Sequence, residues 1–202
     1  MTGPQPNADA GRELRRIVRI NEEIKSVVST AFRINLMAMN AIFLAKRAGQ
    51  SALGFGVLSN ELRKFAGDLQ QQMSILREAT YDSVATVTQA LKRSRIDGLL
   101  SRTGDLLGAA GVPKLKTTPG HRDSGSDGME EVGPRLSHLI QDTTRLVELG
   151  SVLARSAKIE AAYGGVFSAS LMQVSSDFEN TIGNIQHSLA SLEKDEGKER
   201  SE

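Results

Sequence analysis

The chain has 202 residues, with 25 basic against 24 acidic side chains, a formal charge of +1, and neither cysteine nor tryptophan. The absence of cysteine excludes disulfides, thiolate zinc sites and iron–sulfur clusters, and the small net charge argues against nucleic acid as a partner. Aromatic residues make up only 4% of the chain. Its apolar residues are mainly Leu, Ile, Val, Ala and Met, which favours packed helices over β-sheets, so we expect an all-α fold.

Residues 1–11 are polar, and we expect them to form a disordered N-terminus. They lack the apolar stretch of a signal peptide. The most apolar run, residues 34–45, is shorter than the roughly 20 residues that a membrane-spanning helix needs. We therefore expect a cytoplasmic protein with no segment inserted in a membrane.

Residues 12–107 are predicted to form a helical hairpin. Apolar residues recur every three or four positions up to Gly49, where the first helix is expected to end. The inward positions expected in this helix are Ile17, Ile20, Ile24, Val27, Val28, Ala31, Ile34, Ala38, Ala41, Ile42 and Ala45, with Asn21 and Asn35 among them. The spacing resumes after Ser51, through Leu58, Leu62, Phe65, Leu69, Leu76, Val84, Val87 and Leu91. Because the joint is short, the two helices should be antiparallel.

Residues 108–133 are rich in Gly, Pro, Ser, Thr and Asp, which is typical of a flexible linker. Residues 134–192 predict a second hairpin, which begins at Pro134 and turns near Gly164. The positions expected to face the core are Leu136, Ile140, Thr143, Val147, Ala154, Ala157 and Ala161 in its first helix, and Leu171, Val174, Phe178, Ile182, Ile185, Leu189 and Leu192 in its second. Residues 193–202 form a charged tail. Each hairpin alone would leave an apolar face in water, so we expect the two hairpins to form a four-helix bundle with coiled-coil-like packing. The sequence leaves open whether they pack within one chain or swap between two.

The two hairpins carry a faint internal repeat. Residues 153–165 align with residues 37–49 without a gap. The matching positions are Ala154, Ala157, Ala161 and Gly165 with Ala38, Ala41, Ala45 and Gly49. Alanine at this spacing before a glycine is common in helical hairpins, so duplication and chance both explain the match.

Residues 31–66 read AFRINLMAMNAIFLAKRAGQSALGFGVLSNELRKFA. This stretch resembles, without a gap, the cytoplasmic signalling tip of methyl-accepting chemotaxis receptors. The shared positions are Asn35, Leu36, Ala38, Asn40, Ala41, Ala45, Arg47, Ala48, Gly49, Gly54, Phe55, Val57, Glu61, Arg63 and Ala66. The match crosses the turn at Gly49, where the periodicity alone places it.

In that family the tip is an antiparallel hairpin that dimerises into a four-helix bundle, associates further, and contacts a histidine kinase and its coupling protein. The resemblance implies a divergent, soluble and truncated relative: a non-enzymatic signalling or scaffold protein that binds partners of a chemosensory pathway and can self-associate. One chain would supply all four helices. The partner-binding residues that the resemblance implies are Phe32, Asn35, Asn40, Leu44, Arg47, Gly49, Leu53 and Phe55.

The sequence also departs from the family pattern near the turn. A glutamate of the pattern is replaced by Leu44, and an arginine by Leu53. Such replacements change the coupling surface and offer a different apolar contact. They favour a second hypothesis, in which the bundle has been recruited as a structural or regulatory partner of an unrelated assembly.

We expect no enzyme activity, no cofactor and no metal site. The chain has no phosphate-binding loop, no nucleophile elbow, and no His and carboxylate set with metal-ligand spacing. Of its three histidines, His121 lies in the expected linker. A histidine phosphotransfer module built on His138 is a further alternative, although neither an acidic residue directly after the histidine nor a Lys–Gly pair is present.

Overall fold

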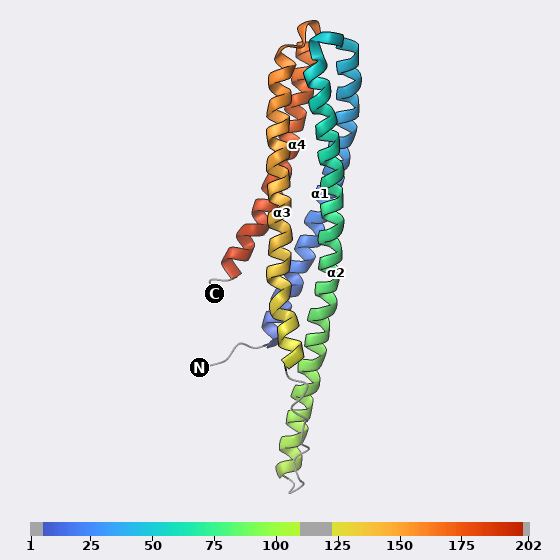
Figure 1. Cartoon of the computed structure of the whole chain (residues 1–202). Coiled ribbons are helices and arrows are strands. Elements are labelled where there is room, and N and C mark those ends of the chain that lie inside the picture. The colour runs from blue at the N-terminus through green and yellow to red at the C-terminus, as the bar shows by residue number, and fades with distance from the viewer. Residues whose placement is uncertain (1–5, 110–122, 200–202) are drawn as a thin grey trace. The chain divides into compact units, whose positions relative to one another are not determined.

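The computed structural model describes residues 6–109 and 123–199. Within these ranges every residue is helical except Tyr163 and Gly164, and no strand occurs. The elements are α1 (Pro6–Ala48), the 3-10 turn η1 (Gly49–Ala52), α2 (Leu53–Ala109), α3 (Asp123–Ala162), the 3-10 turn η3 (Gly165–Phe167) and α4 (Ser168–Glu199) (Figure 1). The predicted all-α fold is confirmed.

The helices contribute to two compact units. Unit 1 combines Met1–Ile20 with Glu78–Leu136, and unit 2 combines Asn21–Arg77 with Ser137–Glu202. Of the described residues, unit 1 contains the first turns of α1 and α3 and the last part of α2. Unit 2 contains the rest of these three helices and all of α4.

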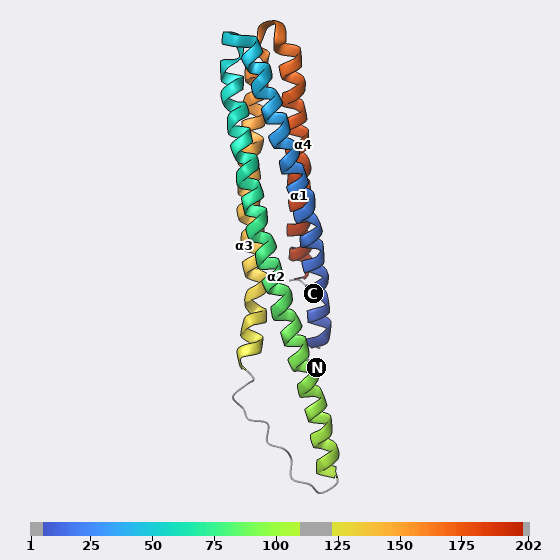
Figure 2. The ribbon, with the colours of Figure 1, turned by 90° about the vertical axis from the view of Figure 1, so that its right-hand side faces the viewer.

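Unit 2 is a four-helix bundle made of two antiparallel hairpins, α1 with α2 and α3 with α4 (Figures 1 and 2). Its buried residues alternate by three and four positions, which is the heptad spacing of coiled coils. On α1 these residues are Ile24, Val27, Ala31, Ile34, Ala38, Ala41 and Ala45. On α4 they are Leu171, Ser175, Phe178, Ile182, Ile185, Leu189 and Leu192. The predicted bundle of two hairpins is confirmed.

The core of the second hairpin matches the periodicity closely. The expected positions Leu136, Ile140, Thr143, Val147, Ala154, Ala157 and Ala161 are all buried. On α1 the expected stripe is too wide. Val28 is 37% exposed and Ile42 is half-buried, because the strict alternation turns Val27 and Ala41 inward instead.

Three polar residues in the bundle core are satisfied within their own helices. The hydroxyls of Ser59 and Thr143 donate hydrogen bonds of 2.8 Å to the carbonyl oxygens of Phe55 and Leu139, four residues earlier. Ser175 donates in the same way to Leu171 at 2.9 Å. A buried hydroxyl without a partner would destabilise the fold, so this local bonding lets small polar residues occupy core positions.

The helices extend beyond several expected boundaries. Helix α1 begins at Pro6, inside the expected disordered terminus, since proline is tolerated in the first helical turn. Helix α3 begins at Asp123 and contains Pro134, so residues 123–133 are helical rather than linker. Helix α4 continues to Glu199, inside the expected charged tail. The remaining parts of these expectations fall on residues 1–5, 110–122 and 200–202, which lie outside the described residues.

One helical stretch, within Gly11–Gly104, contains 18 residues that are apolar enough to cross a membrane by length and composition alone. Core helices of soluble proteins also pass this test, so it is weak evidence for a span. Only 28% of this 18-residue window is buried. Part of its apolar surface therefore faces outward.

Candidate functional site

The turns η1 and η3 lie beside each other at one end of unit 2, which we call the tip. Gly49 has φ +67° and Gly165 has φ +55°, in the left-handed region that favours glycine. A Cβ built on Gly165 would lie 3.9 Å from Ser51 Oγ, which places the two turns in contact range. Ser51 in turn donates a 2.9 Å hydrogen bond to the carbonyl of Ala48. The residues aligned by the internal repeat thus occupy equivalent places in the two hairpins.

Phe55 is 0% exposed, so the expectation that it lies on a partner-binding surface is wrong. Its position belongs to the heptad register of α2, which buries Phe55, Ser59, Leu62, Ala66, Leu69, Met73 and Leu76 and continues that of Ala52 in η1. The polar Ser59 interrupts the apolar pattern in the sequence and hides this register. Phe55 is a core residue that anchors the start of α2.

The other expected contact residues lie at or near the surface of unit 2. Phe32 is 55% exposed and Leu53 is 59% exposed. Asn40, Arg47 and Gly49 are exposed as well, whereas Asn35 and Leu44 are half-buried. Their partner-binding role stays a prediction, but all of them except Phe55 present atoms to solvent.

An apolar stripe covers the outward face of α1, and sequence reasoning missed most of it. We define the outer stripe as Val28, Phe32, Leu36, Met39 and Phe43, all of which are exposed. Steps of four, four, three and four residues keep them on one side of the helix. The sequence signal that could have identified the outer stripe is the set of apolar positions on α1 that do not belong to its heptad core. An exposed row of this size is typical of an interaction surface.

The chain around the outer stripe is basic. No aspartate or glutamate occurs in residues 24–60, which contain Lys25, Arg33, Lys46 and Arg47. Lys46 and Arg47 lie in the last turn of α1, where cations are stabilised by the negative end of the helix dipole. The segment of α1 that carries the outer stripe thus has basic side chains but no acidic ones.

The second hairpin adds further apolar groups at the tip and an ion pair below it. Tyr163 is exposed, and Val166 in η3 is 96% exposed. Lys158 Nζ on α3 donates to Glu179 Oε2 on α4 at 2.7 Å. This hydrogen bond, together with the positive charge of Lys158, holds the pKa of the Glu179 carboxyl below its ordinary value.

Neither of the two histidines that the structure describes lies in a group of metal ligands. His138 is exposed, and its Nδ1 atom lies 3.1 Å from Asp142 Oδ2, one turn further along α3. His187 is also exposed, and His121 lies outside the described residues. Among the side chains that the structure describes, no three His, Asp or Glu residues are grouped so as to hold a metal ion.

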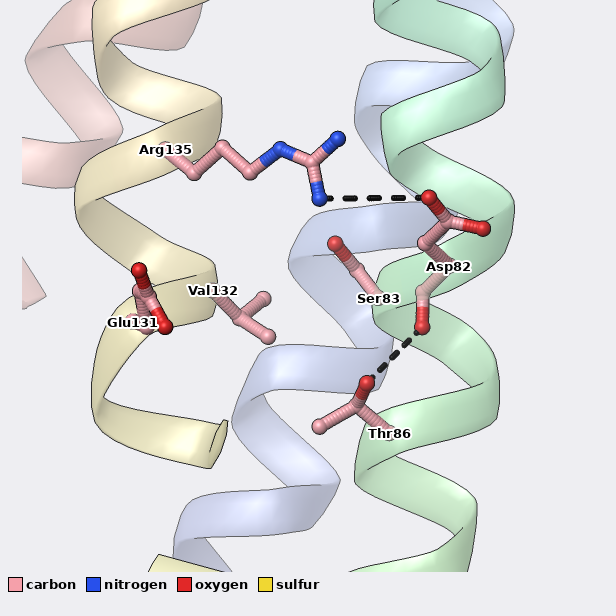
Figure 3. Close-up of a pocket in the computed structure, with 6 residues that line it drawn as sticks. All are labelled: Asp82, Ser83, Thr86, Glu131, Val132 and Arg135. Carbon is pink, nitrogen blue, oxygen red and sulfur yellow. Dashed lines mark hydrogen bonds and ion pairs between the residues drawn. The ribbon is translucent and has the colours of Figure 1, made fainter. Parts of the chain in front are cut away.

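Unit 1 contains a separate shallow pocket of about 380 Å³ between α2 and α3 (Figure 3). Its lining residues are Asp82, Ser83, Thr86, Glu131, Val132 and Arg135. Arg135 Nη1 lies 3.8 Å from Asp82 Oδ2, and both side chains are mostly exposed. An exposed pair at this distance contributes little binding energy, and the pocket offers no convergent set of catalytic groups.

Similar sequences occur in chemotaxis receptors. The chain is 23% identical over 185 residues to the methyl-accepting chemotaxis protein McpG of Pseudomonas putida. This alignment covers 88% of this chain and 28% of that protein. It is 26% identical over 148 residues to methyl-accepting chemotaxis protein I of Escherichia coli, covering 67% of this chain and 26% of that protein. A shorter match, 33% identical over 78 residues, is to the putative sensory transducer protein YvaQ of Bacillus subtilis, covering 37% of this chain and 14% of that protein. No family model matches the chain.

The chain spans little more than a quarter of the length of the first of these relatives. Several matches to such proteins cover most of this chain at low identity. The chain therefore contains a divergent signalling domain like that of the methyl-accepting chemotaxis proteins.

Proposed function

We propose that this chain is a non-enzymatic cytoplasmic signalling or scaffold protein whose tip binds proteins of a chemosensory pathway. The partners that the family resemblance implies are a histidine kinase and its coupling protein. The contact surface is centred on Asn40 and Arg47, and extends over the outer stripe of α1 and over Leu53.

One observation carries the proposal. Ten of the fifteen positions shared with the receptor tip fall into two groups by burial. Ala38, Ala41, Ala45, Phe55 and Ala66 are buried, so packing alone accounts for them. A second group is exposed, and packing does not require it: Leu36, Asn40, Arg47, Val57 and Arg63. A binding surface accounts for this second group, because exposed positions are free to vary unless something contacts them.

The core of the tip also suits a signalling role. The alanine layers of α1 and α3 are buried, and their small side chains let neighbouring helices approach closely. Small shifts between alternative packings of such helices can link events along a bundle to its tip. In this mechanism, Gly49 and Gly165 keep the conformation of the two turns constant, while the packing of the helices against one another changes.

The proposal is tested by affinity capture from lysate of the source organism. The bait is the full chain, compared with a double variant Asn40→Ala, Arg47→Ala. The matched control is Arg77→Ala, which removes an exposed arginine of unit 2 that is distant in sequence from η1. The wild type and the control should recover a chemosensory kinase or coupling protein, and the double variant should not. Equal recovery by all three baits, or by none, contradicts the proposal.

A second candidate function rests on one observation, the 59% exposure of Leu53 where the family pattern has arginine. An exposed leucine at a turn supplies an apolar contact to a partner that does not require the family's charge. Under this alternative the bundle serves an unrelated assembly. The variant Leu53→Arg distinguishes the two: it should preserve or strengthen capture of the chemosensory proteins, but abolish capture of an assembly that depends on the leucine.

A further inference from the structure

Helix α1 carries a second heptad pattern on its outer stripe, in addition to the one that packs in the core of unit 2. Four exposed residues of the stripe follow one another at steps of four, three and four positions: Phe32, Leu36, Met39 and Phe43. This alternation is the spacing of positions a and d, through which two helices pack as a coiled coil. The outer stripe therefore has the spacing that receives one further helix.

One flank of this pattern is basic. When Leu36 and Phe43 are placed at position a of the heptad, position e falls on every seventh residue from Arg33. The residues at position e, which we call the flanking row, are Arg33, Asn40 and Arg47. All three are exposed. In a coiled coil, charged residues at e lie beside those of the partner helix and set the choice of partner.

Helix α2 adds a basic residue on the other side of the outer stripe. Gly56 faces α1, since a Cβ built on it would lie 3.4 Å from the Cβ of Ala45. At 100° per residue, the exposed Arg63 lies within about 20° of Gly56 round the helix. Glu61 and Asp68 lie about 120–140° from Gly56, so they point away from α1. The side of α2 that adjoins the outer stripe is therefore basic as well.

Helix α4 brings one carboxylate to the side of the flanking row. α4 adjoins α1, because Thr181 Oγ1 lies 4.0 Å from Met37 Sδ. Round α1, the flanking row lies between the outer stripe and Met37. Asp177, one turn before Thr181, accepts a 3.0 Å hydrogen bond from Gln173 of its own helix. The two arginines of the flanking row outnumber this carboxylate, so this edge has a net positive charge.

We propose that the outer stripe binds an amphipathic helix of another protein, whose apolar a and d residues are flanked by glutamate or aspartate. The inference rests on the proposed function and names the chemistry of the partner surface. The apolar residues of the partner helix pack on the outer stripe. Its carboxylates pair with the flanking row on one side and with Arg63 on the other.

A second copy of this chain fits the outer stripe less well. Antiparallel pairing of two outer stripes brings the two flanking rows together, because e then lies beside e. Parallel pairing places Lys46, at position d, opposite Lys46 of the other copy. The exposed apolar row of α3, which contains Val152 and Ile159, has Glu148 and Arg155 seven residues apart on one flank. That row therefore offers no uniformly acidic edge.

A lipid surface fits less well than a helix because the outer stripe is narrow. At 100° per residue, the stripe covers an arc of about 80° from Val28 to Leu36. This is less than the arc of about 100° or more of a broad amphipathic face, and it is closer to the seam of a coiled coil. The stripe is thus suited to one partner helix.

The test uses two synthetic helical peptides of about four heptads, both with leucine at positions a and d. One peptide carries glutamate at e and g and the other carries lysine there, so like charges keep each peptide from pairing with itself. Fluorescence anisotropy measures the binding of each peptide to the full chain. The wild type should bind the glutamate peptide about tenfold more tightly than the lysine peptide, and high salt should reduce this preference.

The charged part of the proposal is tested by reversing the flanking row. Arg33→Glu, Arg47→Glu should weaken binding of the glutamate peptide about tenfold, since two attractive pairs become repulsive. The matched control is Arg77→Glu, Arg155→Glu, which makes the same change in net charge at exposed arginines elsewhere in unit 2. The control should bind the glutamate peptide within about twofold of the wild type, because distant surface charges are screened.

The apolar part has a control supplied by the internal repeat. Phe43 and Ile159 are aligned in the repeat and are 61% and 64% exposed. Phe43→Gln should weaken binding of the glutamate peptide about tenfold or more, and Ile159→Gln should leave it unchanged. All these substitutions are at exposed positions, so helicity measured by circular dichroism should stay at the wild-type value.

Four results would overturn the proposal. These are no binding of the glutamate peptide, equal binding of the two peptides, equal effects of Phe43→Gln and Ile159→Gln, or self-association that Phe43→Gln abolishes in place of peptide binding. Binding to phosphatidylglycerol vesicles that the glutamate peptide does not compete away would overturn it in favour of a lipid surface. If a chemosensory protein binds the chain and the glutamate peptide does not, this inference alone fails. If the peptide binds with the expected preference and neither chemosensory protein binds, the proposed function alone fails.

Discussion

Replacing Gly150 with alanine is expected to destabilise unit 2, although alanine is the better helix former. Gly150 on α3 is buried, and a Cβ built there would collide with the ring of Phe65 on α2, lying 2.7 Å from Cε1 and from Cε2. Phe65 is itself buried, so its ring has little room to withdraw. Overpacking of this kind costs about 1–3 kcal/mol, against a gain of about 1 kcal/mol in helix propensity. The net change is a loss of about 0–2 kcal/mol.

Gly67 provides the matched control. It lies in α2 and is exposed, and a Cβ built there meets nothing within 4 Å. Gly67→Ala should therefore raise the free energy of unfolding by about 1 kcal/mol. Urea denaturation of both variants, followed by circular dichroism, measures the difference between the two substitutions. That difference should equal the overpacking cost, about 1–3 kcal/mol.

The same experiment in a Phe65→Leu background assigns the cost to one contact. With the smaller side chain, Gly150→Ala should lose most of its penalty, which gives a coupling energy of about 1 kcal/mol or more. Should Gly150→Ala stabilise the protein as much as Gly67→Ala does, α2 and α3 would not pack at this point, and the bundle described for unit 2 would be wrong.

Three further predictions concern the turns, the ion pair and the histidine. Gly49→Ala and Gly165→Ala should each lower the free energy of unfolding by about 1–2 kcal/mol, measured by urea denaturation, because both glycines have positive φ; no effect would contradict the left-handed turns. The pKa of Glu179 is lowered in the folded state, so its pair with Lys158 stabilises the fold above the ordinary carboxyl pKa and loses this effect as the pH falls through the lowered value. The difference in melting temperature between wild type and Glu179→Gln should accordingly shrink from neutral pH to about pH 3, and a constant difference would argue against the pair. Incubation with a labelled phosphodonor should give no acid-labile label on His138, whereas label that disappears in His138→Gln would establish phosphotransfer.

Much of the fold could be predicted from the spacing of apolar residues. On α3 and α4 this spacing is nearly uninterrupted, and the expected positions are buried with few exceptions, such as the half-buried Val174. On α1, additional apolar residues such as Val28 and Ile42 adjoin the core positions, so the sequence alone could not separate the inward face from the outer stripe. Two hydrophobic rows on one helix become distinguishable only when the neighbouring helices are in place.

The site could be predicted only in part. The family resemblance located the turn and the exposed Arg47, but it gave no sign of which shared residues are buried. Phe55 lies between Gly54 and Gly56 and four residues before Ser59, so small and polar residues hid its place in the heptad.

Calorimetric titration of the full chain with purified chemosensory coupling protein, and then with the kinase, tests directly whether the tip is a partner-binding surface. The wild type and Arg77→Ala should bind at least one of these proteins with a saturable isotherm. The double variant Asn40→Ala, Arg47→Ala should bind it at least tenfold more weakly while keeping its helicity, as expected on loss of a central arginine contact. Absence of binding to both proteins, or equal affinity of all three forms of the chain, would contradict the proposed function.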